Sequence, residues 1–196
     1  MLNANVARIE NNGNCNMQMK CMLRTVWLWT FPILALLTSY QLLASKIVNN
    51  EAELAYHNGD IVHAQRLFSD RVNRNSQDII AHQYLAKIER LKANLDRAQM
   101  FIDSAIALAP NKANLYYDAA RINASQVISA SIFSISGFAE KTLFYYKKAV
   151  QLNPDNIQYR RALMNFYLRA PAIFGGDTKL ALEEANAIAR LDDIQG

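Results

Sequence analysis

The sequence predicts an all-α protein built from repeated pairs of helices. Glycine and proline are scarce, with 6 and 4 residues in 196, which favours long helices over a turn-rich β-sandwich. A 34-residue period carries Ala64 onto Ala98, and the same period carries Phe68 onto Ile102. Apolar side chains in residues 85–108 keep the three- and four-residue spacing of amphipathic helices. These observations predict a solenoid of stacked helical pairs that share one core.

An apolar segment at residues 25–45 determines where we expect the protein to act. Residues 25–44 contain no charged side chain, and Lys20 and Arg24 precede them. A basic flank followed by an apolar run and a small residue, here Ala44, is typical of a cleaved signal peptide. The alternatives are a transmembrane anchor, because about 20 residues also span a bilayer, and a buried core helix. Cleavage and anchoring both predict export, with the repeats periplasmic or anchored to the inner membrane outside the cytoplasm.

Residues 1–24 form a polar tail with a basic end, in which translation is expected to begin at Met22. Cys15 and Cys21 both lie in this tail, so nothing after residue 45 can form a disulfide or a thiolate metal site. Residues 46–196 hold 18 of the 21 basic and 16 of the 17 acidic residues. This near balance is not the signature of a nucleic-acid-binding protein.

Residues 46–196 divide into about four units, and each unit is expected to be one helical pair. In the first unit, Gly59 and Asp60 mark the turn between the two helices. In the second unit, Pro110 ends the second helix because proline cannot continue it. Small residues such as Ala86 and Ala98 predict close approach of the helix backbones.

The third and fourth units each carry an insertion between their two helices. Pro110 and Pro154 are 44 residues apart, which is ten more than the basic period. The inserted residues 124–136 are uncharged, and we interpret them as an extension of the preceding helix plus an ordered loop; the alternative is a partner-binding lip. Residues 170–177 predict a turn followed by a helix N-cap, whereas an anion-binding nest at the two glycines is the alternative.

The units resemble the tetratricopeptide repeat, whose pattern is W-x2-L-G-x2-Y, then A-x3-F, then P. The resemblance implies a right-handed superhelix of about four repeats that acts as a non-catalytic adaptor for a protein or peptide. The stretch Y-L-x-A-P-x-I-x-G-G-D at 167–177 is similar to one in bacterial exported repeat proteins of undefined role. The residues that match, unit by unit, are Ala52, Ala55, Ala64 and Phe68; His82, Leu85, Ala86, Glu89, Ala98, Ile102 and Pro110; Tyr116, Ala119, Ala120, Asn123, Thr142, Tyr146 and Pro154; and Arg160, Leu163, Met164, Tyr167, Ala181 and Ala185.

In this family the first helix of each unit lines the binding surface, and the resemblance assigns eight residues to it. Four of the eight are basic and none is acidic, so we expect the surface to accept an acidic segment or a terminal carboxylate. One alternative is that the long basic stems only cover apolar surface. Another is a small anionic ligand, bound by an accessory component of a transport system. The eight residues are Gln83, Lys87, Arg90, Asn114, Tyr117, Arg121, Arg161 and Asn165.

The sequence contains no motif that points to catalysis. H-E-x-x-H, G-x-S-x-G, the P-loop and G-x-G-x-x-G are all absent from it. His57 and His63 flank the turn at Asp60 and could share a metal with it, but we interpret them as exposed histidines at helix ends. We therefore expect no enzyme activity, no cofactor and no metal, and membrane contact only through residues 25–45 if these are retained.

Overall fold

The computed structural model of the chain describes residues 51–131 and 134–195. The chain divides into two compact units, Met1–Leu54 and Ala55–Gly196, and the second contains the helical repeats. The tail at residues 1–24 and the apolar segment at 25–45 lie outside the described residues, so the expectations about them stay predictions. Among the residues that the structure does describe, no helix combines the length and apolar character needed to cross a bilayer.

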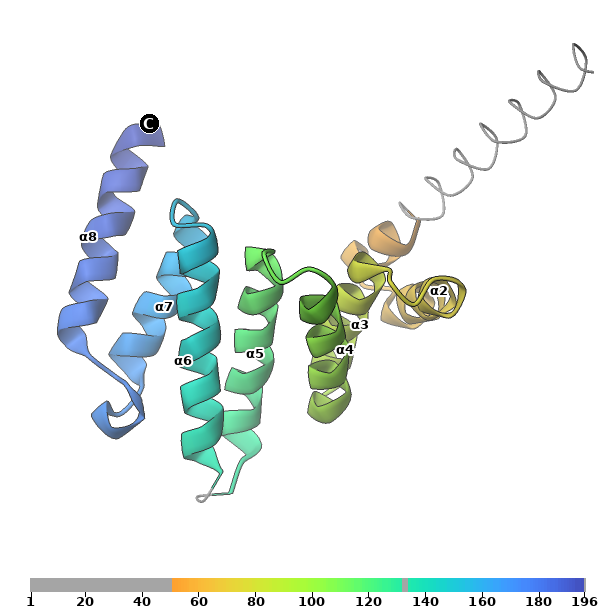
Figure 1. The fold of residues 1–196 in the computed structure, drawn as a ribbon, viewed down its shortest axis with the longest axis horizontal. Coiled ribbons are helices and arrows are strands. Elements are labelled where there is room, and N and C mark those ends of the chain that lie inside the picture. Colours follow the sequence, from red (N-terminus) through yellow and green to blue (C-terminus); the bar gives the residue numbers. More distant parts are fainter. Residues whose placement is uncertain (1–50, 132–133, 196) are drawn as a thin grey trace, which may run out of the picture. The chain divides into compact units, whose positions relative to one another are not determined.

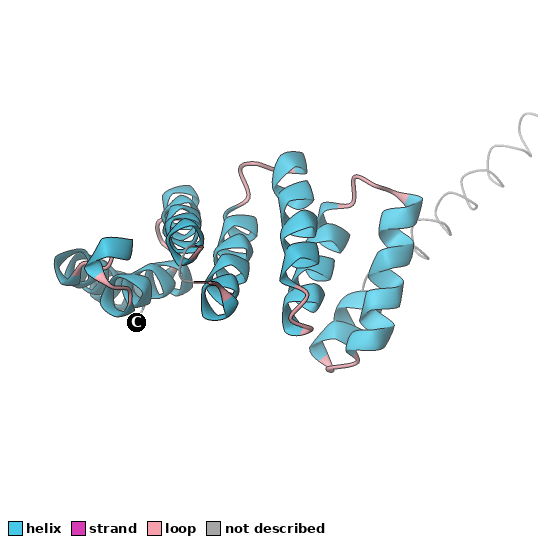
Figure 2. Ribbon diagram, turned by 90° about the horizontal axis from the view of Figure 1, so that it is seen from below, coloured by secondary structure: helices cyan, strands magenta, loops and turns pink. Residues whose placement is uncertain are grey.

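The second unit is built from helices and loops, without a strand in its described part (Figure 2). The strongest packing joins α3 to α4, α5 to α6 and α7 to α8, so consecutive helices form pairs, as Figure 1 shows. The predicted all-α fold of stacked helical pairs is therefore confirmed. The elements are α2 (Ile61–Arg74), α3 (Ile79–Leu91), α4 (Leu95–Leu108), α5 (Ala113–Ser129), α6 (Ile135–Leu152), α7 (Ile157–Arg169), the 3-10 helix η1 (Ala172–Phe174) and α8 (Thr178–Gln195).

Short polar side chains begin several of these helices. The carboxylate of Asp60 accepts a hydrogen bond from the backbone N–H of His63 at the start of α2. Asp78 caps α3 in the same way, and the amide oxygen of Asn156 caps α7. Each cap satisfies a backbone donor that has no partner inside the helix. Asp78 and Asn156 therefore fix where the first helix of their pair starts, and Asp60 fixes where the second helix of the first unit starts.

Small residues allow the helices to pack closely. One core cluster combines alanines of α3, α4 and α5 with Ile102, Leu115 and Ile122. A second cluster takes residues from all four helices α5, α6, α7 and α8, and it includes Ala149 and Leu163. An alanine lets neighbouring backbones approach closely, which draws the larger aliphatic side chains into contact. Ala86 and Ala98, which were predicted at the crossings, are fully buried, and so are Ala105, Ala120 and Ala149.

A buried carboxylate links the first pairs of helices. Glu89 of α3 has an exposed fraction of 0%. Its Oε1 accepts a hydrogen bond from Nε2 of Gln65 in α2 at 2.9 Å, and its Oε2 accepts one from Nδ2 of Asn94 at 2.8 Å. The guanidinium of Arg97 lies 3.5 Å from Oε1. A buried charge is tolerated only when it is paired and hydrogen-bonded, so these contacts explain a glutamate in the core.

The two insertions take different forms. The first lengthens both helices around it, because α5 has 17 residues and α6 has 18, against 13 in α3 and 14 in α4. The predicted extension of the preceding helix is confirmed, whereas residues 132–133 of the loop lie outside the described part.

The second insertion forms η1 and a tight turn. Gly175 has a φ of +92°, and a Cβ on Gly176 would lie only 1.8 Å from the carbonyl oxygen of Ala170. The carboxylate of Asp177 then accepts hydrogen bonds from the N–H groups of Lys179 and Leu180. The predicted turn followed by an N-cap is confirmed.

Candidate functional site

A groove of about 370 Å³ lies on the first helices of the pairs, α3, α5 and α7, with one residue from the helical turn before α2. Residues of α5 line its centre at positions 114, 117, 118 and 121, a spacing that places all four on one face of the helix. We call this site the groove. It is lined by Tyr56, Gln83, Tyr84, Lys87, Asn114, Tyr117, Asp118, Arg121, Gln158 and Tyr159.

Most of the residues that the resemblance assigned come together here. Gln83, Lys87, Asn114, Tyr117 and Arg121 all line the groove. The three others are placed differently. Arg90 lies beside the groove, within electrostatic range of Tyr56 and Arg121. Arg161 is exposed on α7 and does not line the groove, and Asn165 lines a neighbouring pocket.

The groove also contains a carboxylate that the sequence analysis missed. Asp118 is buried, and its Oδ2 accepts a hydrogen bond from Nε2 of Gln83 at 2.6 Å and lies 3.4 Å from Nζ of Lys87. Oε1 of Gln83 accepts in turn from Nδ2 of Asn114 at 3.0 Å. Asp118 shares one face of α5 with Asn114 and Arg121, so the helical period was a signal that could have found it. The positive charge of Lys87 is thus largely compensated inside the groove.

Aromatic rings form much of the groove wall, and sequence reasoning did not single out three of them. The ring of Tyr117 lies 5.0 Å from that of Tyr159, centroid to centroid. The ring of Tyr84 stacks on Phe68 at 4.6 Å and meets Tyr56 edge to face at 5.0 Å. Such pairs hold the rings in place. Tyrosines offer large, amphipathic contact area, which is why they are enriched at protein interfaces.

Two arginines give the groove its uncompensated charge. Burial lowers the pKa of Arg90, and the neighbouring guanidinium of Arg121 lowers it further, while Tyr56 and Asp118 oppose this shift. An arginine nevertheless stays protonated in a protein. Neither guanidinium has a carboxylate within ion-pair distance among the described residues. The charges of Arg121 in the groove and Arg90 beside it therefore repel each other, and a bound anion would relieve that repulsion.

The tyrosine hydroxyls can also donate hydrogen bonds to a bound anion. Burial raises the pKa of the Tyr56 hydroxyl and that of the Tyr159 hydroxyl above the ordinary value. Both groups are then neutral at physiological pH and can donate a hydrogen bond. The groove therefore combines guanidinium groups, phenolic hydroxyls and the amide of Gln158, which are the donors that a carboxylate accepts from.

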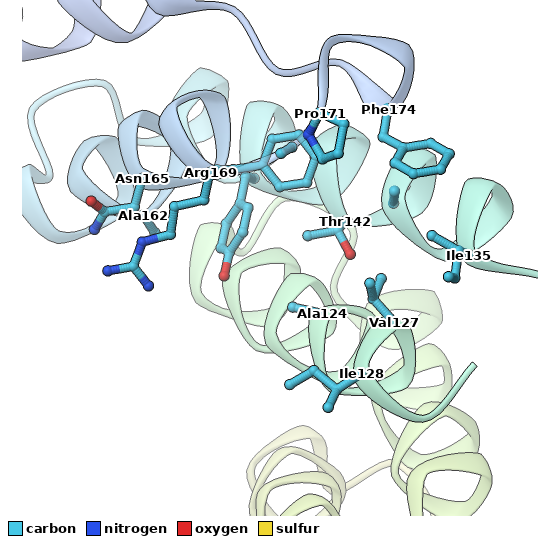
Figure 3. Close-up of a pocket in the computed structure, with 14 residues that line it drawn as sticks. Ala124, Val127, Ile128, Ile135, Thr142, Ala162, Asn165, Arg169, Pro171 and Phe174 are labelled. Atoms are coloured by element: carbon cyan, nitrogen blue, oxygen red, sulfur yellow. The ribbon is translucent and has the colours of Figure 1, made fainter. Parts of the chain in front are cut away.

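A second pocket, of about 520 Å³, lies between the C-terminal part of α5, the N-terminal half of α6, the C-terminal part of α7 and η1 (Figure 3). We call it the apolar pocket. The first insertion contributes Ala124, Val127, Ile128 and Ile135 to its lining, and the second contributes Ala170, Pro171 and Phe174. Nothing in the spacing of the two insertions along the sequence shows that they meet in the fold.

Comparison with known proteins shows likeness in fold. No protein-family model matches the chain, and no curated protein matches it either. Among solved structures, MamA of Desulfovibrio magneticus RS-1 is 20% identical, with a TM-score of 0.59 over 76% of this chain and 75% of that one. A thermophilic tetratricopeptide protein of Thermus thermophilus is 21% identical, with a TM-score of 0.62 over 74% and 72%.

A third structure is described as a tetratricopeptide protein with an unusual peptide-binding site, YrrB. It is 16% identical, with a TM-score of 0.53 over 74% of this chain and 66% of that one. At such identities a structural likeness establishes the fold and leaves the function to be argued from the site. The helical pairs of this chain, together with these likenesses, show that its described part has the tetratricopeptide-like fold.

Proposed function

We propose that the repeat domain is a non-catalytic adaptor whose groove holds an acidic segment of a partner protein. Arg90 and Arg121 carry this proposal, because they are close enough to repel each other and neither is paired with a carboxylate. Elsewhere in the chain a buried arginine is paired, because Nε of Arg71 lies 2.9 Å from Oδ2 of Asp78.

The form of the groove favours a peptide over a folded surface. Its hydrogen-bond donors come from the first helices of three successive pairs. Lys87 is on α3, Arg121 is on α5 and Gln158 is on α7. An extended chain that crosses these helices can present one side chain to each of them. The tyrosine rings between the donors supply apolar contact for the rest of the segment. The affinity is expected to come from a few anchors on the partner.

Binding can be measured by fluorescence anisotropy with the full-length protein in mild detergent. The probe is a fluorescein-labelled ten-residue peptide rich in aspartate and glutamate, and its control carries asparagine and glutamine instead. We expect the acidic peptide alone to bind, with an affinity that falls as salt rises because exposed charges are screened. Arg121→Glu should weaken binding by at least about tenfold, which corresponds to about 1.4 kcal/mol.

The matched control is Arg190→Glu, which makes the same charge change on the exposed surface of α8. We expect it to change the affinity by less than about twofold, because surface charges far from a site are largely screened. Equal losses in the two variants would show that only the net charge matters, and unchanged binding in Arg121→Glu would refute the assignment of the groove.

A small anionic ligand is the second candidate, and the volume of the groove favours it, since about 370 Å³ lies within the range of small-molecule sites. The same titration separates the two candidates. Free glutarate in millimolar excess displaces the labelled peptide only if a lone dicarboxylate is a sufficient ligand. We expect no displacement, because a small anion cannot reach the donors of all three helices.

We also propose that the protein is exported and that the adaptor works in the cell envelope. The support is the sequence of residues 25–45, with its basic flank and uncharged apolar run. Mass spectrometry of the mature N-terminus should show cleavage after Ala44 or Ser45, or an intact anchor. In intact spheroplasts, added protease should then reach a C-terminal tag. A tag that becomes accessible only after lysis would contradict export.

A further inference from the structure

The groove and the apolar pocket are successive parts of one helix surface. On α5 a single stripe, spaced by three and four residues, runs from the groove into the pocket through Asn114, Tyr117, Arg121, Ala124 and Ile128. On α7 a matching stripe runs through Gln158, Ala162, Asn165 and Arg169. The N-terminal part of each helix thus lines the groove, and the C-terminal part lines the pocket.

One ring connects the two sites directly. Tyr146 of α6 lines the apolar pocket, and its ring centroid lies 6.1 Å from that of Tyr117, which lines the groove. Burial raises the pKa of the Tyr146 hydroxyl, while the charges of Arg121 and Arg90 lower it, so these guanidiniums are within electrostatic range of the ring. A ligand that contacts Arg121 is therefore beside the mouth of the pocket.

The pocket itself is apolar and only partly covered by the chain. Val127, Ile135 and Phe174 form part of its wall. Thr142 also lines the pocket, and its hydroxyl donates a hydrogen bond to the carbonyl oxygen of Phe138 within α6. Ile128 at the edge keeps an exposed fraction of 88%. Because Ile128 borders a concave apolar site, an apolar group that enters the site can bury part of this side chain as well.

The apolar pocket, like the groove, has an unpaired arginine in its lining. Arg169 is the one charged residue in its lining, and its guanidinium forms no hydrogen bond or ion pair with another described residue. Figure 3 shows Asn165 and Arg169 together at one end of the pocket, with Ile135 and Phe174 at the other. An apolar group that enters here is therefore favoured when it belongs to an acidic chain rather than a basic one.

We propose that the apolar pocket takes a large apolar side chain of the same acidic segment that the groove binds, and this inference rests on the function proposed above. Ala124 and Ile128 lie three and seven residues beyond Arg121, which is roughly 5 to 10 Å along the helix. An extended peptide covers about 3.3 Å per residue. The partner segment thus has a phenylalanine, leucine, methionine or tryptophan about two or three residues from the carboxylate at Arg121.

Three labelled peptides test the inference with the full-length protein. All contain the same acidic run; one has phenylalanine three residues after it, one has serine there, and one has phenylalanine nine residues after it. The first peptide should bind about tenfold more tightly than the other two, as expected from burial of roughly one large apolar side chain. Equal affinity of the first and second peptides would overturn the inference.

A variant that changes no charge links this advantage to the pocket. Ile128→Asn changes an exposed side chain and no charge, so the fold should be retained, and it should remove most of the advantage of phenylalanine while leaving the serine peptide within twofold. Val62→Asn is the matched control, because Val62 is 82% exposed on α2 and away from both sites. An advantage of phenylalanine that persists unchanged in Ile128→Asn would place the anchor elsewhere and overturn the inference.

The outcomes separate this inference from the function on which it rests. If the acidic peptides bind in an Arg121-dependent way and phenylalanine adds nothing, the groove proposal stands and the pocket proposal falls. If none of the peptides binds, both fall. Binding of laurate that depends on Ile128, without an effect of phenylalanine, would assign the pocket to a free amphiphile and contradict the peptide anchor.

Discussion

Asp118→Asn tests the electrostatic account of the groove, because it removes one negative charge while keeping the size of the side chain. The carboxylate lies 3.4 Å from Nζ of Lys87, and two unit charges at about that distance interact by about 1 kcal/mol in a water-like medium. Asparagine can still accept the hydrogen bond from Gln83. The variant should lose about 1 kcal/mol of stability and free the ammonium group of Lys87 for an incoming carboxylate.

The affinity for the acidic peptide should therefore rise about fivefold, which corresponds to about 1 kcal/mol. Anisotropy titrations at 50 and 500 mM salt measure this gain, and it should shrink at the higher concentration. Asp70→Asn is the control, because it removes the same charge from an exposed position on α2. Weaker binding by Asp118→Asn than by the unmodified protein would refute the reasoning, since the carboxylate would then help to bind the partner.

Other variants test the fold and the limits of the site. Gly176→Ala should destabilise the protein by about 2 kcal/mol or more in urea unfolding, because its Cβ would lie 1.8 Å from the carbonyl oxygen of Ala170; unchanged stability would contradict the turn. Burial alone would raise the pKa of Asp78, but hydrogen bonds from Arg71 and a backbone amide outweigh it and hold that pKa below the usual value. The stability from this group is present above the pKa of the unfolded chain and is lost as the pH falls through the lower folded value, so Asp78→Asn should show a smaller loss than the unmodified protein below about pH 4. Arg161→Glu should weaken acidic-peptide binding by at most about threefold, because its side chain does not line the groove; loss of binding would favour the sequence-based assignment of this residue.

The helical pairs could be predicted from the sequence because their signals are local and repeated. The 34-residue period predicts that Ala98 and Ile102 occupy the same places in their unit as Ala64 and Phe68 in theirs. The N-cap role of Asp177 is predicted by the preference of a helix for a carboxylate at that position. Five groove residues followed from their positions in the first helices. Asp118 was missed because the resemblance selects particular positions, whereas the helix face also brings their neighbours into the site.

Two features of the site could not be predicted, because they depend on contacts between distant parts of the chain. Arg90 and Arg121 are on different helices, and only the packing of α3 beside α5 shows that they repel each other and lack a carboxylate. The apolar pocket requires the end of α5, with Ala124 and Ile128, to lie near the turn of the second insertion, with Pro171 and Phe174. Insertion lengths alone predict an extra segment but not which side of the solenoid it covers.

Photocrosslinking tests the central claim most directly, because it reports where the acidic segment lies. An acidic peptide with one photoreactive phenylalanine analogue would be irradiated with the full-length protein, and the crosslinked residues would be identified by mass spectrometry. We predict crosslinks to Tyr84, Tyr117 or Tyr159 that an excess of unlabelled acidic peptide suppresses and that Arg121→Glu abolishes. Crosslinks confined to the exposed faces of α2, α4, α6 or α8, and unaffected by that variant, would contradict the account.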